Sequence, residues 1–428
     1  MQINVIGLGY TGLPLALWLA QKGYSVLGID TDSQLIQKIT KGQTDLIEAV
    51  PNSQQNFTQF LQDQLTQADF SVTTEYRRLS PNQQVHLLTV GIPVSQNGQY
   101  NLTPLTEAIT DLARILIPDD LVIIKGTLIP GSMTTIVTPL LEQHGFRPGE
   151  NLVLAYCPER LAEGTALLDL DKVPRLVAAE DNFSLDQALD FWLAVSTAPV
   201  VPIHSFLIAE LSKVIENICR DVNIALSNEL NRLLLALDCT FSDLQQAANT
   251  HPRVQLLAPG PGVGGHCLPN ALWYLEPVAQ KYGINLELLK TARDTNLNRP
   301  NEIATFLTGI CPINTSLQPK IAILGLGMKN HCADTRLSPA LALADLLTKV
   351  GYSVSLFDPL VPQLSAPTLD AALNNSQVAI ITALQPGLSA DAILQGVQAC
   401  SPRPIIIDTK QVINQTQAAT LGVEVHYA

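Results

Sequence analysis

The first thirty residues contain the pattern that most restricts how this chain can fold. An apolar run, Ile3–Ile6, leads into the glycine-rich turn Gly7–Gly12, and an amphipathic segment, Leu13–Lys22, comes next. A second apolar run, Tyr24–Ile29, ends at Asp30. This order of strand, turn, helix, strand and acid is typical of a dinucleotide-binding βαβ unit. The sequence therefore predicts a Rossmann-like domain, and a glycine-rich turn of an unrelated α/β unit is the less favoured alternative.

Each glycine of the turn has its own expected role. Gly7 permits the tight turn, Gly9 lets the backbone approach a pyrophosphate, and Gly12 lets the helix pack closely on the sheet. Asp30 is expected to accept hydrogen bonds from the adenosine ribose, and its charge would repel a 2′-phosphate. The sequence therefore predicts NAD as the cofactor in preference to NADP.

Length, charge and cysteine content limit the architecture and the partners. A chain of 428 residues is too long for one core, which predicts two or three domains. A formal net charge of −13 argues against a nucleic-acid partner, because phosphate backbones need clustered Lys and Arg. Seven cysteines without CxxC spacing indicate reduced thiols, and no metal site is expected. With no signal peptide and no apolar run of the ~18 residues that span a membrane, a cytoplasmic protein is expected.

Further strands are expected in the first half of the chain, and two of them lead to polar residues. The apolar runs are Val85–Val90, Leu121–Ile124 and Leu152–Ala155, and Thr127 and Glu159 follow the second and the third. Ligands of open parallel sheets bind beyond the carboxyl ends of the strands, so both residues are expected at the functional edge. For either residue alone, an ordinary turn threonine or a solvated glutamate is the more common explanation.

Residues His204–Asp238 contain no Gly or Pro and carry apolar residues at helical spacing. They predict one long helix, or two abutting ones, that links two α/β halves and could pair with a second subunit in a homodimer. Lys213, Asn217 and Arg220 occur at i, i+4 and i+7 and therefore share a face of this helix. A solvated polar stripe is the alternative explanation for that face.

The last part of the chain repeats the α/β pattern after a polar boundary segment, Cys311–Gln318. We expect a helix at Ser338–Lys349 and strands at Lys320–Leu324, Ser353–Phe357, Val378–Thr382 and Pro404–Ile407. The turn at Gly325–Gly327 lacks a third glycine in register, so no second dinucleotide is expected. The predicted fold is α/β, with two Rossmann-like doubly wound parallel sheets joined by a long central helical segment. The predicted domains are residues 1–200, 201–310 and 311–428.

The stretch Pro259–Pro269 holds four glycines and three prolines in eleven positions, so it is expected to be neither helix nor strand. A stiff loop that ends on His266 and Cys267 would suit the presentation of a thiol. A tight turn with a buried cysteine is an equal alternative for this stretch alone, because free cysteine is among the most buried residue types.

Five stretches along the chain resemble the UDP-glucose/GDP-mannose dehydrogenase family. They are Gly7–Pro14, Tyr156–Arg160, Glu210–Glu229, Ala247–Cys267 and Asp334–Pro339. The resemblance covers essentially the whole chain and is strongest to the branch that acts on UDP-N-acetylhexosamines, UDP-N-acetylmannosamine foremost. It implies an NAD-dependent enzyme that oxidises the C6 alcohol of a UDP-sugar to the uronic acid, for polysaccharide biosynthesis.

The resemblance also implies a covalent mechanism. Oxidation at C6 gives an aldehyde, the thiolate of Cys267 adds to it, a second oxidation leaves a thioester, and water hydrolyses that thioester. Lys213 and Asn217 would stabilise oxyanion character at C6. Glu159 would activate the hydrolytic water, and Thr127 would orient it.

The family motifs imply two sets of binding residues. Cofactor contacts are expected from Gly7, Gly9, Tyr10, Thr11, Gly12, Asp30, Pro93, Thr127 and Arg336. Substrate contacts are expected from Glu159, Arg160, Leu161, Lys213, Asn217, Arg220, Arg253, Gly260, Gly264, Gly265 and Lys329. The C-terminal domain is expected to close over the uridine diphosphate.

One position departs from the family pattern in a way that bears on catalysis. The family has an aspartate four residues after the catalytic cysteine, whereas this chain has Ala271, and the neighbouring Asn270 amide does not titrate usefully. General acid–base assistance contributes ~10²–10⁴-fold, so its loss would slow the chemistry without abolishing binding. The alternatives are a working dehydrogenase, an attenuated enzyme and a binding protein without turnover. Lesser departures are Lys125 and Gly126 before Thr127, Leu337 after Arg336, and Lys410, where the family usually has an arginine.

Overall fold

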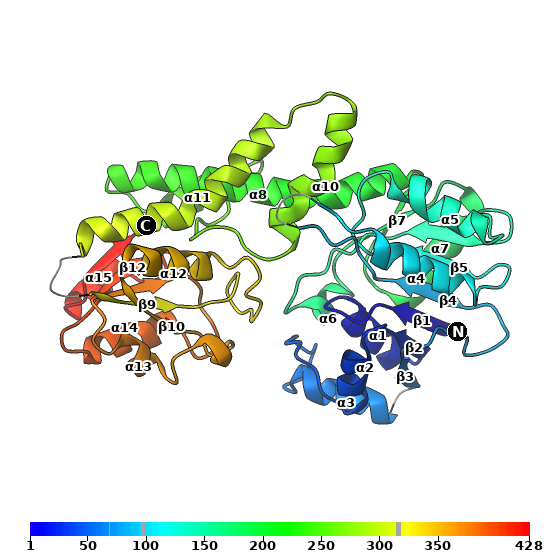
Figure 1. The fold of residues 1–428 in the computed structure, drawn as a ribbon, viewed down its shortest axis with the longest axis horizontal. Helices are drawn as coiled ribbons and strands as arrows, with labels where there is room; N and C mark the ends of the chain where they lie inside the picture. The colour runs from blue at the N-terminus through cyan, green and yellow to red at the C-terminus, as the bar shows by residue number, and fades with distance from the viewer. Residues whose placement is uncertain (68, 96–98, 314–317) are drawn as a thin grey trace. The chain divides into compact units, whose positions relative to one another are not determined.

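The computed structural model describes residues 1–67, 69–95, 99–313 and 318–428 (Figure 1). These residues form two compact units. Unit 1 consists of Met1–Glu216 and Trp273–Gly283, and unit 2 consists of Asn217–Leu272 and Ile284–Ala428. The division into three domains stays a prediction, and residues 314–317 of its boundary segment lie outside the described residues.

Unit 1 contains an eight-stranded sheet with the order β3-β2-β1-β4-β5-β6-β7-β8. All neighbouring strands are parallel except β6 and β7, which pair antiparallel at Tyr156 and Ala178. The strands are β1 (Gln2–Ile6), β2 (Ser25–Ile29), β3 (Phe70–Thr73), β4 (Val85–Leu88), β5 (Leu121–Ile124), β6 (Val153–Tyr156), β7 (Arg175–Ala178) and β8 (Val200–Ile203). The order reverses between β1 and β4, which is the switch point where ligands of such sheets bind.

The central strands of unit 1 are buried on both faces. Every residue of β4, β5 and β6 is buried, and so are the last four residues of β1. Parallel sheets carry helices on both faces, which explains why these runs are continuously apolar rather than alternating. The strands expected from the sequence are confirmed, although β4 ends two residues earlier than expected, at Leu88.

Helices connect the strands of unit 1 (Figure 1). α1 (Gly12–Gln21) packs on β1, β2 and β3, and α7 (Asn182–Val195) packs on β5, β6, β7 and β8. The others are α2 (Ser33–Thr40), α3 (Phe57–Gln67), α4 (Thr103–Ala113), the π-helix η1 (Met133–Val137), α5 (Thr138–Gln143) and α6 (Ala166–Asp169). The side chains of Asp32 and Asp181 cap α2 and α7, so these helices begin at residues that satisfy their free N–H groups.

Unit 2 contains a five-stranded parallel sheet with the order β10-β9-β11-β12-β13. The strands are β9 (Lys320–Leu324), β10 (Ser353–Phe357), β11 (Val378–Ile381), β12 (Ile405–Asp408) and β13 (Val425–Tyr427). Alternate residues of β9 enter two separate cores: Ile321 and Ile323 pack in one, Ala322 and Leu324 in the other. Both faces of this sheet are therefore covered, as in a doubly wound fold.

The helices of unit 2 include α12, which the sequence predicted closely. They are α9 (Phe241–Ala248), α11 (Glu287–Ile310), α12 (Pro339–Val350), the 3₁₀-helix η2 (Pro362–Leu364), α13 (Leu369–Leu373), α14 (Ala390–Ala399) and α15 (Gln415–Thr420). The Ser338 side chain caps α12, Pro339 occupies its first turn, and Gly351 ends it in the left-handed conformation at φ 113°. These three residues are typical helix boundaries.

Two helices have residues in both units. α8 (Phe206–Ala236) is one continuous helix of 31 residues, which decides between the two alternatives for this segment. α10 (Cys267–Lys281) begins inside the stretch that was expected to be neither helix nor strand, so that prediction is wrong for Cys267–Pro269. Proline fits the first turn of a helix because its missing N–H would have no partner there, and Pro269 therefore does not prevent the helix.

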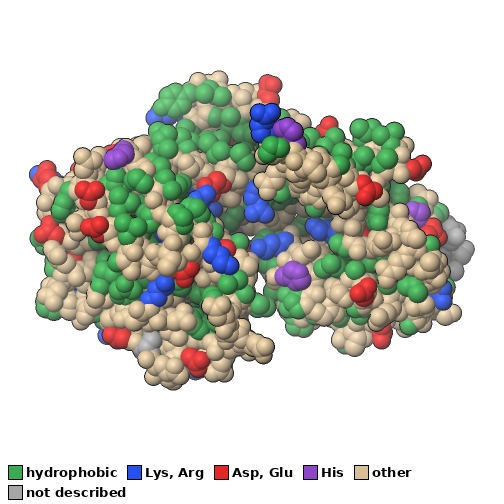
Figure 2. All heavy atoms as spheres, turned by 180° about the vertical axis from the view of Figure 1, so that it is seen from behind, with side chains coloured by type: hydrophobic (Ala, Val, Ile, Leu, Met, Phe, Trp, Pro, Cys, Tyr) green, Lys and Arg blue, Asp and Glu red, His purple; other side chains and the backbone are tan. Residues whose placement is uncertain are grey.

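The acidic side chains are scattered on the face of the molecule that Figure 2 shows, among hydrophobic and basic ones. All seven cysteines lie within the described residues, and all are free thiols. None of the described helices combines the length and the apolar character that crossing a membrane would require.

Candidate active site

The glycine-rich turn follows β1 and leads into α1, beside β4. Gly7 has φ 91°, a conformation that side chains disfavour, and a Cβ on Gly12 would lie 1.8 Å from the carbonyl oxygen of Gly7. A Cβ on Gly9 would meet nothing within 4 Å. The turn is thus tight at Gly7, closely packed at Gly12 and open at Gly9, which suits a pyrophosphate near the N-terminus of α1.

Asp30 supports this turn from the end of β2. Its Oδ2 accepts a hydrogen bond from the backbone N–H of Leu8 at 2.7 Å, and its Oδ1 accepts one from Asp32 at 2.9 Å. Each carboxylate oxygen has further lone pairs, so the half-exposed Asp30 can also accept from ribose hydroxyls. The residues present therefore fit NAD. Tyr10 is exposed, Thr11 precedes α1, and Pro93 follows β4 in the same unit.

The β5 end of the sheet places Thr127 close to the loop after β4. The backbone N–H of Ile92 donates to the carbonyl oxygen of Thr127 at 3.3 Å, and the Tyr274 hydroxyl donates to the carbonyl oxygen of Ile92 at 2.5 Å. Gly126 directly precedes Thr127, and a Cβ on Gly126 would lie 2.1 Å from the carbonyl oxygen of Val90, in the loop after β4. The glycine that departs from the family pattern is thus required by the close approach of two loops.

Replacing Gly126 with alanine is expected to destabilise unit 1 by about 1–3 kcal/mol, because the added methyl would have to displace backbone atoms of Val90. Gly9→Ala is the matched control, since its methyl enters open space, and it should leave stability within about 0.5 kcal/mol. Urea unfolding followed by tryptophan fluorescence reports on unit 1, which contains all three tryptophans. Equal midpoints for the two variants would contradict the expected clash.

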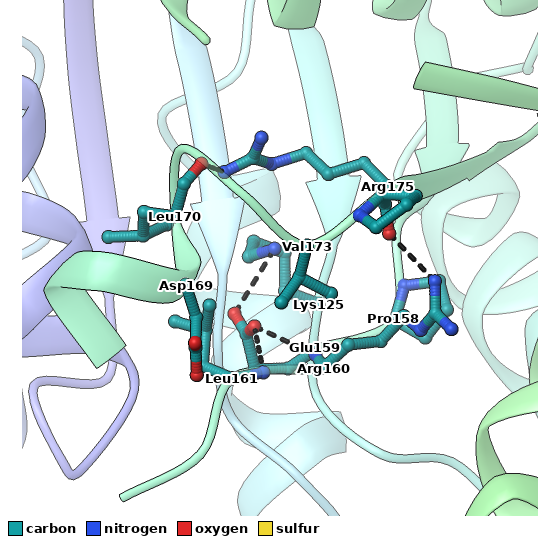
Figure 3. Close-up of a pocket in the computed structure, with 10 residues that line it drawn as sticks. Lys125, Pro158, Glu159, Arg160, Leu161, Asp169, Leu170, Val173 and Arg175 are labelled. Atoms are coloured by element: carbon teal, nitrogen blue, oxygen red, sulfur yellow. Dashed lines mark hydrogen bonds and ion pairs between the residues drawn. The ribbon is translucent and has the colours of Figure 1, made fainter. Parts of the chain in front are cut away.

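Glu159 follows β6, and hydrogen bonds hold one of its carboxylate oxygens while an ion pair lies at the other. Its Oε1 accepts the backbone N–H groups of Arg160 at 2.9 Å and Leu161 at 3.1 Å. Its Oε2 lies 3.2 Å from the Nζ of Lys125, which is buried at the end of β5. Figure 3 shows Lys125 and Glu159 pointing toward each other in a small pocket that Leu161 and Arg175 also line. Arg160 pairs with Glu216 at 2.8 Å.

Glu210 and Lys213 lie on the part of α8 that belongs to unit 1, and both are buried. The Glu210 carboxylate accepts the backbone N–H groups of Gly131 at 2.6 Å and Met133 at 2.8 Å, so it fastens α8 to the start of η1. Burial raises the pKa of Glu210 to about 7. Asn217, one helical turn beyond Lys213, is half-buried in unit 2, and Arg220 is exposed there.

The raised pKa of Glu210 predicts a pH-dependent stability. The folded state disfavours the charged form, so this group lowers the free energy of unfolding as pH rises from its ordinary value of 4.5 to about 7. The full loss is about 3 kcal/mol. Glu210→Gln should remove this decline, as seen by urea unfolding at pH 5 to 8, whereas Glu142→Gln at an exposed carboxylate should retain it. If the free energy of unfolding changes with pH in the same way in the wild type and both variants, Glu210 is not the group responsible for the decline.

In unit 2, the glycine-rich loop before Cys267 packs against residues 328–339. A Cβ on Gly264 would lie 2.6 Å from the carbonyl oxygen of Leu337, and one on Gly265 would lie 2.1 Å from the sulfur of Met328. The N–H of Gly265 donates to the carbonyl oxygen of Arg336 at 2.7 Å. These glycines therefore permit a close approach of two chain segments, whether or not they also contact substrate.

Gly260 lies nearer the start of the same loop and is held from α8 and α11. Its N–H donates to the Oδ1 of Asn228 at 2.9 Å, and its carbonyl oxygen accepts from the Nε of Arg299 at 3.1 Å. The ammonium of Lys410 lies on the other side, 3.3 Å from where a Cβ would be. Burial lowers the pKa of Lys410, and the negative charge of Asp408 acts in the opposite direction.

Cys267 is exposed at the first residue of α10. Its neighbour His266 accepts a hydrogen bond at Nδ1 from the amide of Asn270 at 3.0 Å, which places the ring proton on Nε2. Burial and the nearby Arg336 lower the pKa of His266, while Asp334 opposes them. Asn270 is therefore engaged with His266, and Ala271 beside it is buried. No carboxylate occupies either position.

The remaining residues of unit 2 that were predicted to bind substrate or cofactor are exposed. Arg253 lies in the loop after α9, and Lys329 and Arg336 lie between β9 and α12. Arg336 forms a close ion pair with Asp334, with its Nε 2.8 Å from Oδ2. The structure thus places Thr127, Glu159 and Lys213 in unit 1, and Asn217, Cys267 and these three cations in unit 2.

The turn of the second sheet differs from the first. A Cβ on Gly327 would lie 2.0 Å from the carbonyl oxygen of Cys332, so the backbone here is covered, unlike that at Gly9. Asp358 accepts the N–H groups of Leu326 at 2.6 Å and Gly327 at 3.1 Å. These donors bond within the protein, and the expectation of a single dinucleotide site stays a prediction.

The sequence motifs assign no role to Lys125 or Glu210. Lys125 nevertheless pairs with Glu159, and Glu210 binds the backbone at the start of η1. The signal for Lys125 was a cation directly after an apolar strand. For Glu210 it was an acid one turn before Lys213 on a helix. Neither signal names the partner, because the partners are distant in the sequence.

Comparison with known families identifies three consecutive segments. They match the NAD binding domain of the UDP-glucose/GDP-mannose dehydrogenase family at residues 1–190, its central domain at residues 208–298 and its UDP binding domain at residues 322–415.

Similar individual proteins cover most of the chain. The UDP-N-acetyl-D-mannosamine dehydrogenase of Methanococcus aeolicus is 32% identical over 390 residues, which is 89% of this chain and 83% of that protein. The structure of the UDP-D-ManNAc dehydrogenase from Pyrococcus horikoshii is 30% identical with a TM-score of 0.86, covering 100% of this chain and 99% of that one. The UDP-N-acetyl-mannosamine dehydrogenase of Staphylococcus aureus is 27% identical with a TM-score of 0.83, covering 100% and 97%.

Proposed function

The chain belongs to the UDP-glucose/GDP-mannose dehydrogenase family, and from that premise we propose that it oxidises the C6 alcohol of a UDP-N-acetylhexosamine to the uronic acid. It is an NAD-dependent oxidoreductase, and UDP-ManNAc is the favoured substrate because the similar proteins carry that name. The observation that carries the covalent mechanism is the exposed thiol of Cys267 at the first residue of α10.

Cys267 would act as the nucleophile of the reaction. Its sulfur forms a bond to C6 of the aldehyde produced by the first oxidation, and the thiol proton moves to the resulting hydroxyl. The second oxidation removes hydride from C6 and a proton from that hydroxyl, which leaves a thioester. Water then breaks the S–C6 bond and restores the thiol. NAD, held by Gly7–Gly12 and Asp30, supplies the hydride acceptor in both oxidations.

The other predicted residues would have separate roles in this chemistry. Lys213 and Asn217, one turn apart on α8, would donate hydrogen bonds to the oxygen at C6, and loss of one such donor typically costs ~2.7–4 kcal/mol. Glu159 would activate the hydrolytic water, with Thr127 orienting it. Arg220, Arg253, Lys329 and Arg336 would bind the sugar and its diphosphate, and Arg336 would also contact NAD.

We propose the same three-part organisation that the sequence predicted. Residues 1–200 would bind NAD, residues 201–310 would carry the cysteine loop and the dimer interface, and residues 311–428 would bind the UDP-sugar. The dimer proposal is supported by Leu226 and Leu233, which α8 leaves 48% and 57% exposed. Sedimentation at twice the chain mass of 46.2 kDa would support a dimer, and a single-chain mass would exclude it.

A second candidate function, an attenuated enzyme, is favoured by one observation. The position where the family has an aspartate is the buried, apolar Ala271, and the adjacent Asn270 is engaged with His266. Such an enzyme would bind UDP-sugar and NAD but turn over slowly or release the aldehyde.

The test is an assay with UDP-ManNAc, UDP-GlcNAc, UDP-GalNAc and UDP-glucose, followed by NADH absorbance and product mass. Two NADH for each UDP-ManNAc consumed, with a uronic acid product, is the expected result. One NADH with an aldehyde product would favour the attenuated enzyme. If none of the four sugars reduces NAD, the dehydrogenase proposal is wrong and a binding function remains.

A further inference from the structure

We infer that Lys125 is a positioning residue that fixes the orientation of the Glu159 carboxylate, acting through Glu159 rather than on the substrate. The inference rests on the proposed role of Glu159 in thioester hydrolysis. Lys125 and Glu159 are 34 positions apart in the sequence, and the ends of the neighbouring strands β5 and β6 bring them together.

The ammonium of Lys125 is enclosed within unit 1. The side chain is 2% exposed, and its Nζ lies 3.2 Å from the Oε2 of Glu159 and 3.5 Å from the carbonyl oxygen of Cys157. The ring of Trp192 covers a further side, with its centroid 4.9 Å from Nζ. A buried ammonium needs such partners, because desolvation of an unpaired charge is very costly.

Arg175 holds Trp192 from a second direction. Its guanidinium carbon lies 4.7 Å from the Trp192 centroid and 5.5 Å from the Trp18 centroid. Lys22 lies over Trp18 at 4.4 Å, so cations and indole rings alternate from Lys22 to Lys125. The stack leaves Lys125 little freedom to move, and its position therefore sets the position of Glu159.

The two oxygens of Glu159 are held by different groups. Oε1 is bound by two backbone N–H groups that belong to the loop after β6, whereas Oε2 has the Lys125 ammonium beside it. Backbone donors on one oxygen leave the carboxylate free to swing about that anchor. The ion pair with the ammonium at the other oxygen restricts this movement, and the Glu159 side chain is only 11% exposed.

This arrangement assigns Lys125 a specific effect on one step. Without the ammonium, Glu159 keeps its backbone contacts but loses its fixed orientation, so water activation should suffer more than either oxidation. A misplacement of about 1 Å costs on the order of 10²-fold in rate. Thioester hydrolysis should therefore slow by about that factor in Lys125→Met, and the acyl group should accumulate on Cys267.

The experiment follows the Cys267 adduct by rapid quench and intact-protein mass, with UDP-ManNAc and NAD. Lys125→Met should accumulate the thioester, as should Glu159→Gln, and Lys125→Arg should restore most of the hydrolysis rate. Lys38→Met is the control, because Lys38 forms an ion pair with Asp45 at 2.6 Å in the same unit but belongs to neither the stack nor the contacts of Glu159. It should hydrolyse the thioester like the wild type.

The outcomes separate this inference from the proposed function. If Glu159→Gln accumulates the adduct and Lys125→Met does not, the role of Lys125 is refuted and that of Glu159 stands. If no protein forms an adduct or reduces NAD, both proposals fall. Tryptophan fluorescence checks that each variant is folded, and Lys125→Gln takes the place of Lys125→Met in the same assay if the latter is not.

Discussion

Replacing Cys267 with serine is expected to stop the reaction after the first oxidation, so that each UDP-sugar yields one NADH in place of two. The serine hydroxyl is a far weaker nucleophile than a thiol, and without the S–C6 bond the aldehyde has no covalent route to the carboxylate. The thiol is exposed at the start of α10, so the change leaves no cavity and the protein should fold normally. NADH absorbance, with an aldehyde-specific hydrazine to trap the product, measures both results.

Cys239→Ser is the matched control for this prediction. Cys239 is a second exposed thiol of unit 2, and its sulfur contacts only the carbonyl oxygen of Leu237 among the hydrogen bonds of the described residues. The control should keep two NADH per sugar. Two NADH per sugar in Cys267→Ser as well would mean that Cys267 is structural and that the carboxylate forms by another route.

The fold was predictable because its signals are local. The apolar runs of β1, β4, β5 and β9, the glycine-rich turn and the caps of α12 each lie within a few adjacent residues. Two features were missed because they depend on more than a local pattern. An apolar run does not state its direction, so the antiparallel pairing of β6 with β7 was not visible. The start of α10 was hidden by glycines that end at Gly265, two residues before the helix, and by Pro269, which fits its first turn.

The sequence motifs indicate which residues belong to the candidate site, but they do not indicate the buried charged residues that hold the neighbouring segments in place. The motif Gly7–Gly12 with Asp30 has a fixed spacing that can be recognised in the sequence. In the structure a Cβ would have room at Gly9 but not at Gly12. The roles of Cys267, Lys213 and Glu159 stay predictions, since they came from motifs. Two buried charges that the motifs did not indicate, Lys125 and Glu210, bind partners 34 and 79 positions away. Such pairings arise only when strands and helices are packed, and no short motif encodes them.

Replacing Asp120 with asparagine is expected to destabilise unit 1 by about 3–5 kcal/mol, because it removes one partner of a buried ionic cluster. Asp120 lies directly before β5 with its side chain fully buried. Its carboxylate oxygens accept hydrogen bonds from both terminal nitrogens of Arg78, at 2.5 and 3.2 Å. They also accept hydrogen bonds from the backbone N–H groups of Gln84 and Ile117, at 2.8 and 2.9 Å. Asparagine keeps the shape but presents an N–H₂ group to some of these donors.

The neighbouring His86 increases the loss of stability that is expected for Asp120→Asn. It is fully buried in β4, with Nε2 3.4 Å from Asp120 and Nδ1 3.3 Å from the amide of Asn4. Burial lowers the pKa of His86, so the neutral ring with its proton on Nε2 faces the carboxylate. An asparagine N–H₂ in the same place would oppose that proton. The cluster therefore has no arrangement that satisfies every donor once the carboxylate is gone.

The same cluster predicts acid sensitivity. Burial alone would raise the pKa of Asp120, but hydrogen bonds from His86, Arg78 and the two backbone N–H groups outweigh it, and the pKa lies well below its ordinary value of 3.8. A carboxyl group with a lowered pKa stabilises the fold above pH 4 and loses that contribution as pH falls further. The wild type should therefore lose stability steeply below pH 4, and Asp120→Asn should lose less.

Urea unfolding followed by tryptophan fluorescence at pH 7 and at pH 3.5 measures both effects on unit 1. The matched control is Asp45→Asn, at an aspartate whose side chain is 83% exposed and pairs with Lys38 at 2.6 Å. A surface pair of this kind contributes ~0–1 kcal/mol, so the control should unfold close to the wild type at both pH values. An Asp120→Asn protein within about 0.5 kcal/mol of that control at pH 7 would show that Arg78 and His86 find other partners or water. The buried carboxylate would then not be what holds the start of β5 to the rest of the sheet.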